Sequence, residues 1–108
     1  MTVSRLIDEL DLEVLSLPFP DREIKGGYTG DLLSWVRGRA KADNVWITIM
    51  TNINVVAVAS LSDVAAVVIA ENAEIGAGVI KKAEEQGINI LRSKCPTYET
   101  AIAVAKLI

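Results

Sequence analysis

Two nearly continuous apolar runs constrain the fold of this chain more than any other feature. "NVWITIM" (44–50) and "AAVVIA" (65–70) are rich in Val, Ile and Ala and contain no charged side chain. Uninterrupted apolar strands, as opposed to alternating ones, are typical of a parallel sheet that is covered on both faces. The sequence therefore predicts a sheet that lies between two layers of helices.

Segments with helical spacing separate the predicted strands. Thr2 is placed to cap a first helix, and Gly87 to end a later one in a left-handed conformation. Residues 54–61 fit a strand or a helix, and the Thr-Asn pair before them favours a helix by offering capping side chains. The predicted helices are 3–10, 31–41, 54–61, a segment with Ile75, Val79, Ile80 and Ala83 on one face, and a final segment with a stripe of Tyr98, Ala101, Ile102, Ala105 and Ile108.

Further strands alternate with these helices along the chain. A buried strand is predicted over 12–17, a short extended segment over 22–26 and a last strand over 88–92. In a chain of 108 residues this alternation indicates one domain of the α/β class, covering residues 1–108. The expected architecture is a three-layer α/β/α fold with a mostly parallel sheet.

Charge and composition exclude several classes of partner. The formal net charge is −3 and the 11 Lys and Arg residues are scattered, so no nucleic-acid partner is expected. No stretch reaches the roughly 18 apolar residues of a membrane span, so no membrane association is expected. Cys95 is the only cysteine, which predicts no intrachain disulfide and fits a cytoplasmic, reducing compartment.

The chain lacks the residues that most enzymes use. It has no histidine, which is the commonest general base and transition-metal ligand, and no Gly-Lys-Ser/Thr phosphate-binding loop. We therefore expect no catalytic residue, no metal site and no cofactor. A small enzyme that uses Asp31, Lys25 or Lys94 is the least supported of three hypotheses.

The stretch "EIKGGYTGDLLSWV" (23–36) holds the first half of a candidate ligand site. Glycine lets a backbone approach a ligand closely, and a helix N-terminus attracts phosphate through its unpaired N–H groups. "GGYTGD" (26–31) and "TNIN" (51–54) both follow extended segments and precede helices, so both should open on the same edge of the sheet. The candidate ligand-binding residues are Gly26, Gly27, Tyr28, Thr29, Gly30, Asp31, Thr51, Asn52 and Asn54.

A structural interpretation of the same residues stays open. The glycines can supply turn dihedrals, Thr29 or Asp31 can cap the helix that follows them, and Asn52 or Asn54 can cap the next helix. If Asp31 caps its helix, its carboxylate occupies the positive end of the helix and repels phosphate. Single-sequence motifs of this kind do not distinguish the two interpretations.

Three blocks of the sequence resemble a known family. "DREIKGGYTGDLLSWV" (21–36), "VWITIMTNINVVAVASLSDVAAVVIAEN" (45–72) and "AEEQGINIL" (83–91) together resemble the DRTGG domain, which is similar to the N-terminal domain of HPr kinase/phosphorylase. The name-giving string is not intact, and only Asp21, Arg22, Gly26 and Gly27 echo it. The resemblance implies a three-layer α/β/α fold and a regulatory or dimer-forming role beside CBS pairs in regulated pyrophosphatases. It implies no kinase activity, because the kinase chemistry of that family belongs to a separate P-loop domain.

The leading functional hypothesis is a non-catalytic regulatory module that forms a homodimer and binds a small anionic ligand such as an adenine nucleotide. A homodimer is expected because hydrophobic residues make up 51% of a chain that is too small to hold them all in its interior. The alternative is a protein-interaction domain that serves a larger metabolic enzyme and has no ligand of its own.

Overall fold

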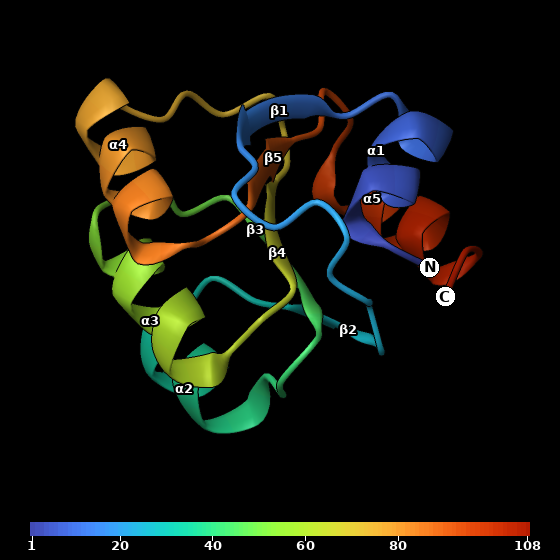
Figure 1. Cartoon of the computed structure of the whole chain (residues 1–108). Coiled ribbons are helices and arrows are strands. Elements are labelled where there is room, and N and C mark those ends of the chain that lie inside the picture. The colour runs from blue at the N-terminus through green and yellow to red at the C-terminus, as the bar shows by residue number, and fades with distance from the viewer.

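A five-stranded sheet lies between two groups of helices in the computed structural model, which describes residues 1–108 (Figure 1). The strands are β1 Glu13–Ser16, β2 Gly27–Thr29, β3 Val45–Thr48, β4 Ala66–Ile69 and β5 Ile90–Arg92. They lie in the order β1-β5-β4-β3-β2. Strands β2 to β5 are parallel to one another, and β1 pairs with β5 in the antiparallel direction. The predicted three-layer α/β/α fold with a mostly parallel sheet is confirmed.

The order of the parallel strands decides which helices share a face. The helices α2 Leu33–Arg39, α3 Asn54–Ser62 and α4 Ala77–Gln86 each connect two neighbouring parallel strands. Such crossovers are right-handed, so three successive crossovers in the same direction place their helices on one face of the sheet. The helices α1 Val3–Leu10 and α5 Thr97–Ala105 cover the opposite face (Figure 1).

Strands β3 and β4 are buried along their whole length. Successive residues of a strand point to opposite faces, so these two strands supply two separate cores. Val45 and Ile47 pack in the core beneath α1 and α5, whereas Trp46 and Val67 pack in the core beneath α2, α3 and α4. The uninterrupted apolar runs of the sequence therefore reflect strands that are covered on both sides.

Local signals at the ends of helices are confirmed. The side chain of Thr2 accepts a hydrogen bond from the backbone N–H of Arg5 at the start of α1. Gly87 ends α4 with φ of 73°, a left-handed conformation that glycine adopts without steric cost. Residues 54–61, which fitted a strand or a helix, lie in α3 as predicted.

Two strand predictions near the N-terminus are wrong in position or burial. The segment 12–17 is an edge strand rather than a buried one, since only Ser16 of β1 is buried and Val14 is 45% exposed. The extended segment predicted over 22–26 is not a strand of the sheet, and its Glu23 makes only an isolated bridge to Thr2. The strand β2 begins at Gly27 instead, inside the stretch 26–31 that was predicted to follow the extended segment and precede a helix.

The predicted stripe on the last helix is wrong for most of its residues, and only Ala101 packs against the core. Thr100 and Val104 are the buried residues of α5, whereas Tyr98 is 75% exposed and Ile102 is 37% exposed. The apolar spacing identified the helix correctly, but apart from Ala101 it missed the residues that pack on the sheet. Part of the apolar surface of α5 is therefore left uncovered.

A single arginine links the turns that lead into the two central strands. The Arg22 guanidinium donates to Oδ1 of Asp43 at 3.1 Å and to Oδ1 of Asp63 at 2.9 Å. Asp43 and Asp63 both have positive φ, 66° and 55°, and they lie shortly before β3 and β4. Arg22, one of the residues that echo the DRTGG string, therefore stabilises the starting edge of the sheet.

A buried asparagine ties the segment after β1 to the sheet. Nδ2 of Asn89 donates to the backbone oxygens of Phe19 at 2.8 Å and of Ala65 at 2.9 Å. Oδ1 of the same side chain accepts from the backbone N–H of Phe19 at 3.0 Å. Asn89 is 3% exposed, so water cannot readily replace these partners if the amide is removed.

We expect Asn89→Ala to lower the free energy of unfolding by roughly 2–4 kcal/mol, because it removes three hydrogen bonds and leaves buried backbone groups unpaired. Urea unfolding followed by circular dichroism measures the change. Asn54→Ala is the matched control, because Asn54 is exposed and its change should stay within about 0.5 kcal/mol. Equal effects of the two substitutions would contradict the role assigned to Asn89.

Candidate functional site

The glycine-rich stretch forms strand β2 and the residues that flank it. Gly27, Tyr28 and Thr29 pair in parallel with Val45, Trp46 and Ile47 of β3. Gly26 has φ of 142°, a backbone conformation that L side chains rarely adopt, and a Cβ there would lie 3.1 Å from Nδ2 of Asn44. Gly26 is therefore required by the backbone itself, whereas Gly27 lies in an ordinary strand conformation.

The structure separates the two halves of the predicted ligand site. Gly27 lies at the start of β2 beside Val45, whereas Asn52 follows the end of β3. The prediction that all of residues 26–31 share one polar pocket with residues 51–54 is therefore wrong. Only the end of the first segment, Gly30 and Asp31, reaches the carboxyl edge of the sheet, where Gly30 N–H donates to the oxygen of Ile47.

Asp31 joins the loop after β2 to the end of β3. Its Oδ1 accepts from Oγ1 of Thr48 at 2.8 Å and from the backbone N–H of Ile49 at 2.9 Å. The suggested role of Asp31 or Thr29 as a helix cap is wrong, because the residue before α2 is Leu32 and no side chain caps that helix. The carboxylate instead satisfies polar groups at the end of a central strand.

The N-terminus of α3 is already satisfied within the chain. Oδ1 of Asn52 accepts from the backbone N–H of Asn54, the first residue of α3, at 2.9 Å, whereas the N-cap residue itself, Ile53, makes no side-chain capping bond. The next two N–H groups, those of Val55 and Val56, donate to the backbone oxygens of Asn52 and Ile53. Donors that a phosphate would need are therefore occupied, one of them by the side chain of Asn52. The N-cap position is held by Ile53 and not by Asn52 or Asn54.

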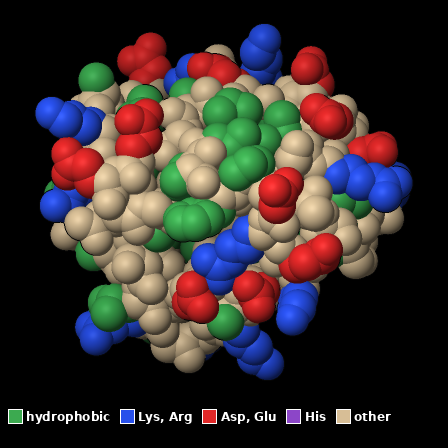
Figure 2. Space-filling model, viewed as in Figure 1, with side chains coloured by type: hydrophobic (Ala, Val, Ile, Leu, Met, Phe, Trp, Pro, Cys, Tyr) green, Lys and Arg blue, Asp and Glu red, His purple; other side chains and the backbone are tan.

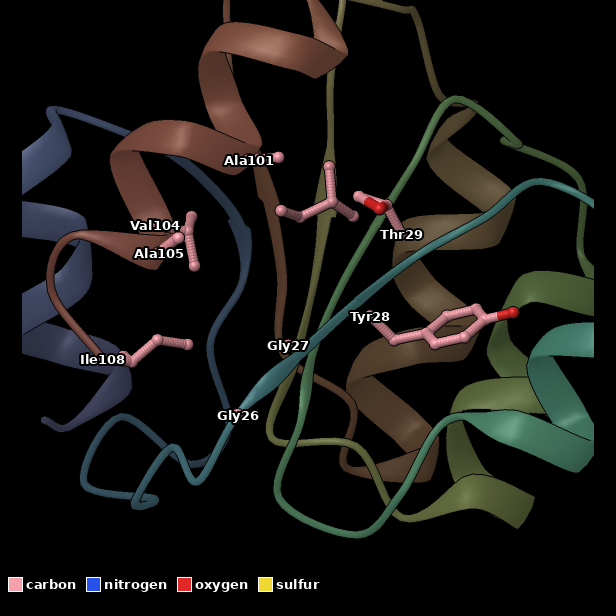
Figure 3. A pocket seen from close by; sticks show the side chains of 9 residues that line it. Gly26, Gly27, Tyr28, Thr29, Ala101, Val104, Ala105 and Ile108 are labelled. Carbon is pink, nitrogen blue, oxygen red and sulfur yellow. The ribbon is translucent and has the colours of Figure 1, made fainter.

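A groove of about 340 Å³ runs between β2 and α5, on the face of the sheet that α1 and α5 cover (Figure 3). In Figure 3 the side chains of Val104 and Ile108 point toward β2, whereas the ring of Tyr28 points away from α5. No charged side chain lines this groove. Its lining residues are Gly26, Gly27, Tyr28, Thr29, Ile47, Ala101, Val104, Ala105 and Ile108.

The groove combines four of the predicted site residues with a helix that sequence reasoning did not connect to them. Ala101 and Ala105 belong to the apolar stripe predicted for the last helix, and both line the groove, although Ala101 also packs against the core. A stripe of small apolar residues on a terminal helix was therefore the signal in the sequence. It became interpretable only when the packing of α5 against β2 was known.

Large apolar side chains are exposed near the hydrogen bonds that join Asp31 to Thr48 and Ile49. Leu32 and Trp35 follow Asp31, and Ile49 and Ile53 flank the loop after β3, with exposed fractions between 44% and 57%. The guanidinium of Arg39 lies 3.8 Å from the ring centroid of Trp35, a cation–π contact. Trp46, in contrast, is fully buried and donates through Nε1 to the oxygen of Gly30 at 2.9 Å.

The remaining candidate catalytic residues do not form a cluster. Lys25 precedes β2 and Asp31 follows it, so the two residues lie at opposite ends of the strand. Cys95 is exposed, and its backbone N–H donates to Oγ of Ser93 at 3.1 Å. No group of three or more Cys, Asp or Glu side chains is placed to hold a metal ion. Basic and acidic side chains are interspersed on the face shown in Figure 2.

None of the helices has the length and apolar character that a membrane-spanning segment requires.

Comparison with known proteins shows a likeness of fold. No protein-family model matches the sequence, and no curated protein matches it. The chain is similar in structure to the CBS and DRTGG domains of the regulatory region of Clostridium perfringens pyrophosphatase, a crystal structure complexed with the activator diadenosine tetraphosphate. The TM-score is 0.74 at 10% sequence identity, over 95% of this chain and 45% of that chain. The chain thus spans less than half of the neighbour's length, and the likeness is one of fold.

We expect Asp31→Ala to lower the free energy of unfolding by about 1.5–3 kcal/mol, because hydrogen bonds to a charged group are lost at the end of β3. Asp31→Asn keeps an acceptor oxygen and should cost less. Urea unfolding measures both changes. Asp21→Ala, which removes an exposed carboxylate without hydrogen bonds, is the control and should have little effect. A fully stable Asp31→Ala protein would show that the link has no structural role.

Proposed function

We propose that this chain is a non-catalytic regulatory module that acts by forming a homodimer. The observation that carries the proposal is the division between its polar and apolar side chains. Arg22, Asp31 and Asn52 are all engaged in hydrogen bonds within the chain. Large apolar side chains such as Leu32, Trp35 and Tyr98 are more than half exposed. A surface of this kind is more typical of a protein–protein interface than of a catalytic site.

The arrangement of the charged residues supports the absence of catalysis. General acid–base catalysis requires groups within hydrogen-bond reach of one reacting centre. Asp31 already accepts two hydrogen bonds from the end of β3, and Lys25 lies at the other end of β2. The hypothesis of a small enzyme that uses these residues therefore receives no support from their geometry.

A ligand-binding function is the second candidate, and the groove between β2 and α5 favours it. Its volume of about 340 Å³ falls within the range of small-molecule sites, roughly 300–1,000 Å³. Because no lysine or arginine lines it, the groove suits an adenine ring whose phosphates extend into solvent. The structural neighbour was crystallised with an adenine dinucleotide, which makes adenine nucleotides the first ligands to test.

A larger enzyme partner is the natural target of such a module. The neighbour of similar fold belongs to the regulatory region of a pyrophosphatase. We infer that this chain likewise acts on a metabolic enzyme, whether that enzyme is encoded in the same polypeptide or separately.

Light scattering of the purified chain should give twice the 11.6 kDa mass of one chain at micromolar concentration. The physical reason is the exposed apolar surface, whose burial contributes about 25 cal/mol per Å². A mass of one chain over the whole concentration range would overturn the proposed homodimer.

Diadenosine tetraphosphate or a simpler adenine nucleotide should raise the melting temperature if the groove binds it. A ligand present at 100 times its dissociation constant stabilises the folded state by about 2.7 kcal/mol, or on the order of 10 °C for a domain of this size. Ala105→Phe fills the groove from α5 and should abolish the shift. Ala77→Phe, at an exposed position of α4, is the matched control and should retain it.

A flat response of the wild-type chain to millimolar nucleotide would remove the ligand function and leave the dimer proposal untouched. A shift that persists in Ala105→Phe would place the ligand outside this groove.

A further inference from the structure

The outer edge of β2 is an uncovered sheet edge. β2 is the last strand of the sheet, with β3 on one side and no strand on the other. Backbone groups of Gly26 and Gly30 bond to β3, through Gly26 oxygen to Val45 N–H and Gly30 N–H to Ile47 oxygen. Since the bonding direction alternates along a strand, the N–H and C=O groups of Gly27 and Thr29 point away from β3. Both residues are exposed.

This edge has few of the features that prevent strands from pairing with other chains. Natural edges are protected by very short strands, by charged side chains such as lysine, by proline and by bulges. The opposite edge of this sheet has such features, because β1 carries a register shift between Val14 and Ser16 and begins with Glu13. β2 is short, but it pairs with β3 in regular register without a bulge, and its residues Gly27, Tyr28 and Thr29 include no lysine or proline.

We propose that β2 pairs with β2 of a second copy of this chain, antiparallel and about a two-fold axis that passes beside Tyr28. The inference rests on the proposed homodimer and assigns its interface. Two copies joined in this way form one continuous sheet of ten strands. The two-fold axis stands perpendicular to that sheet, so α5 of both copies lies on the same face.

The register of this pairing follows from the outward-facing groups. Gly27 of one copy lies opposite Thr29 of the second copy, and each such pair exchanges two N–H···O=C bonds. The symmetric pair doubles this number, which gives about four hydrogen bonds between the copies. Tyr28 of one copy lies opposite Tyr28 of the other, and these two residues form the central non-hydrogen-bonded pair.

Charge complementarity at the ends of the strand points to a second copy as the occupant. Lys25 lies three residues before Tyr28 and Asp31 three residues after it, so antiparallel pairing brings Lys25 opposite Asp31 of the second copy. The side chain of Lys25 is 70% exposed and forms a long ion pair within the chain, with Nζ 4.0 Å from Oδ2 of Asp43. Asp31 uses only Oδ1 in its bonds within the chain. Two such pairs form in one dimer.

The groove beside β2 lies next to the proposed interface. Ile108 is 43% exposed, and its Cδ1 lies 3.8 Å from where a Cβ of Gly27 would be. The two copies place their α5 helices on one face of the joined sheet, so their two grooves lie on that same face. A larger side chain at Gly27 would project toward Ile108 in the groove.

A proline at position 29 tests the pairing directly. Thr29→Pro removes an outward N–H while leaving the bonds of Gly26 and Gly30 to β3 in place, and proline is tolerated at such edge positions. Two hydrogen bonds of the dimer are lost, so the dissociation constant from sedimentation or light scattering should rise at least about tenfold. Thr29→Val keeps the N–H and should leave the dimer unchanged. Circular dichroism verifies that both variants fold.

A cysteine at the axis gives an independent readout. Opposite residues of a pair without hydrogen bonds lie about 4.5 Å apart between Cα atoms, which is within disulfide range. Tyr28→Cys in a Cys95→Ser background should therefore form a covalent dimer on mild oxidation. Ala77→Cys in the same background, at an exposed helix position, should not.

The outcomes separate the interface from the homodimer itself. A wild-type monomer would overturn both the proposed function and this inference. A wild-type dimer that persists in Thr29→Pro, with no cross-link through Tyr28→Cys, would overturn the strand pairing alone. Loss of the dimer in Thr29→Pro together with the cross-link would support it.

Discussion

The burial of β3 and β4 on both faces is the constraint on which the rest of the structure depends. An apolar strand of this kind is stable only between two layers, and each buried aliphatic side chain contributes about 1.5–3 kcal/mol. Val45 and Ile47 require α1 and α5 above them, and Trp46 and Val67 require α2, α3 and α4 on the other side. The succession of right-handed crossovers then leaves β2 as an outer strand.

Polar side chains serve mainly to hold the ends of these strands in place. Arg22 joins the turns before β3 and β4, Asp31 satisfies groups after β3, and Asn89 anchors the segment that follows β1. Side chains engaged in this way have little capacity left for a substrate. The features left for function are therefore an apolar groove, exposed apolar side chains and the open backbone edge of β2.

Much of the fold was predictable because its signals are local. A helix cap such as Thr2, a left-handed terminator such as Gly87 and an apolar run such as 65–70 act over a few neighbouring residues. The candidate site was less predictable. Asp31 bonds to Thr48, 17 positions away, and no pattern within residues 23–36 indicates that partner. The likeness in fold to the pyrophosphatase regulatory region does not assign these contacts either.

The sequence by itself determined the three-layer architecture, because periodicity and apolar content dictate which segments are buried on one side and which on both. Only the tertiary structure decided that Gly27 is part of a strand and that Asn52 lies away from it. It also decided that α5 packs through Thr100 and Val104. The physical reason is that strand register and helix rotation depend on contacts between distant segments. Such contacts become energetically defined only when the sheet and both of its helical layers are assembled.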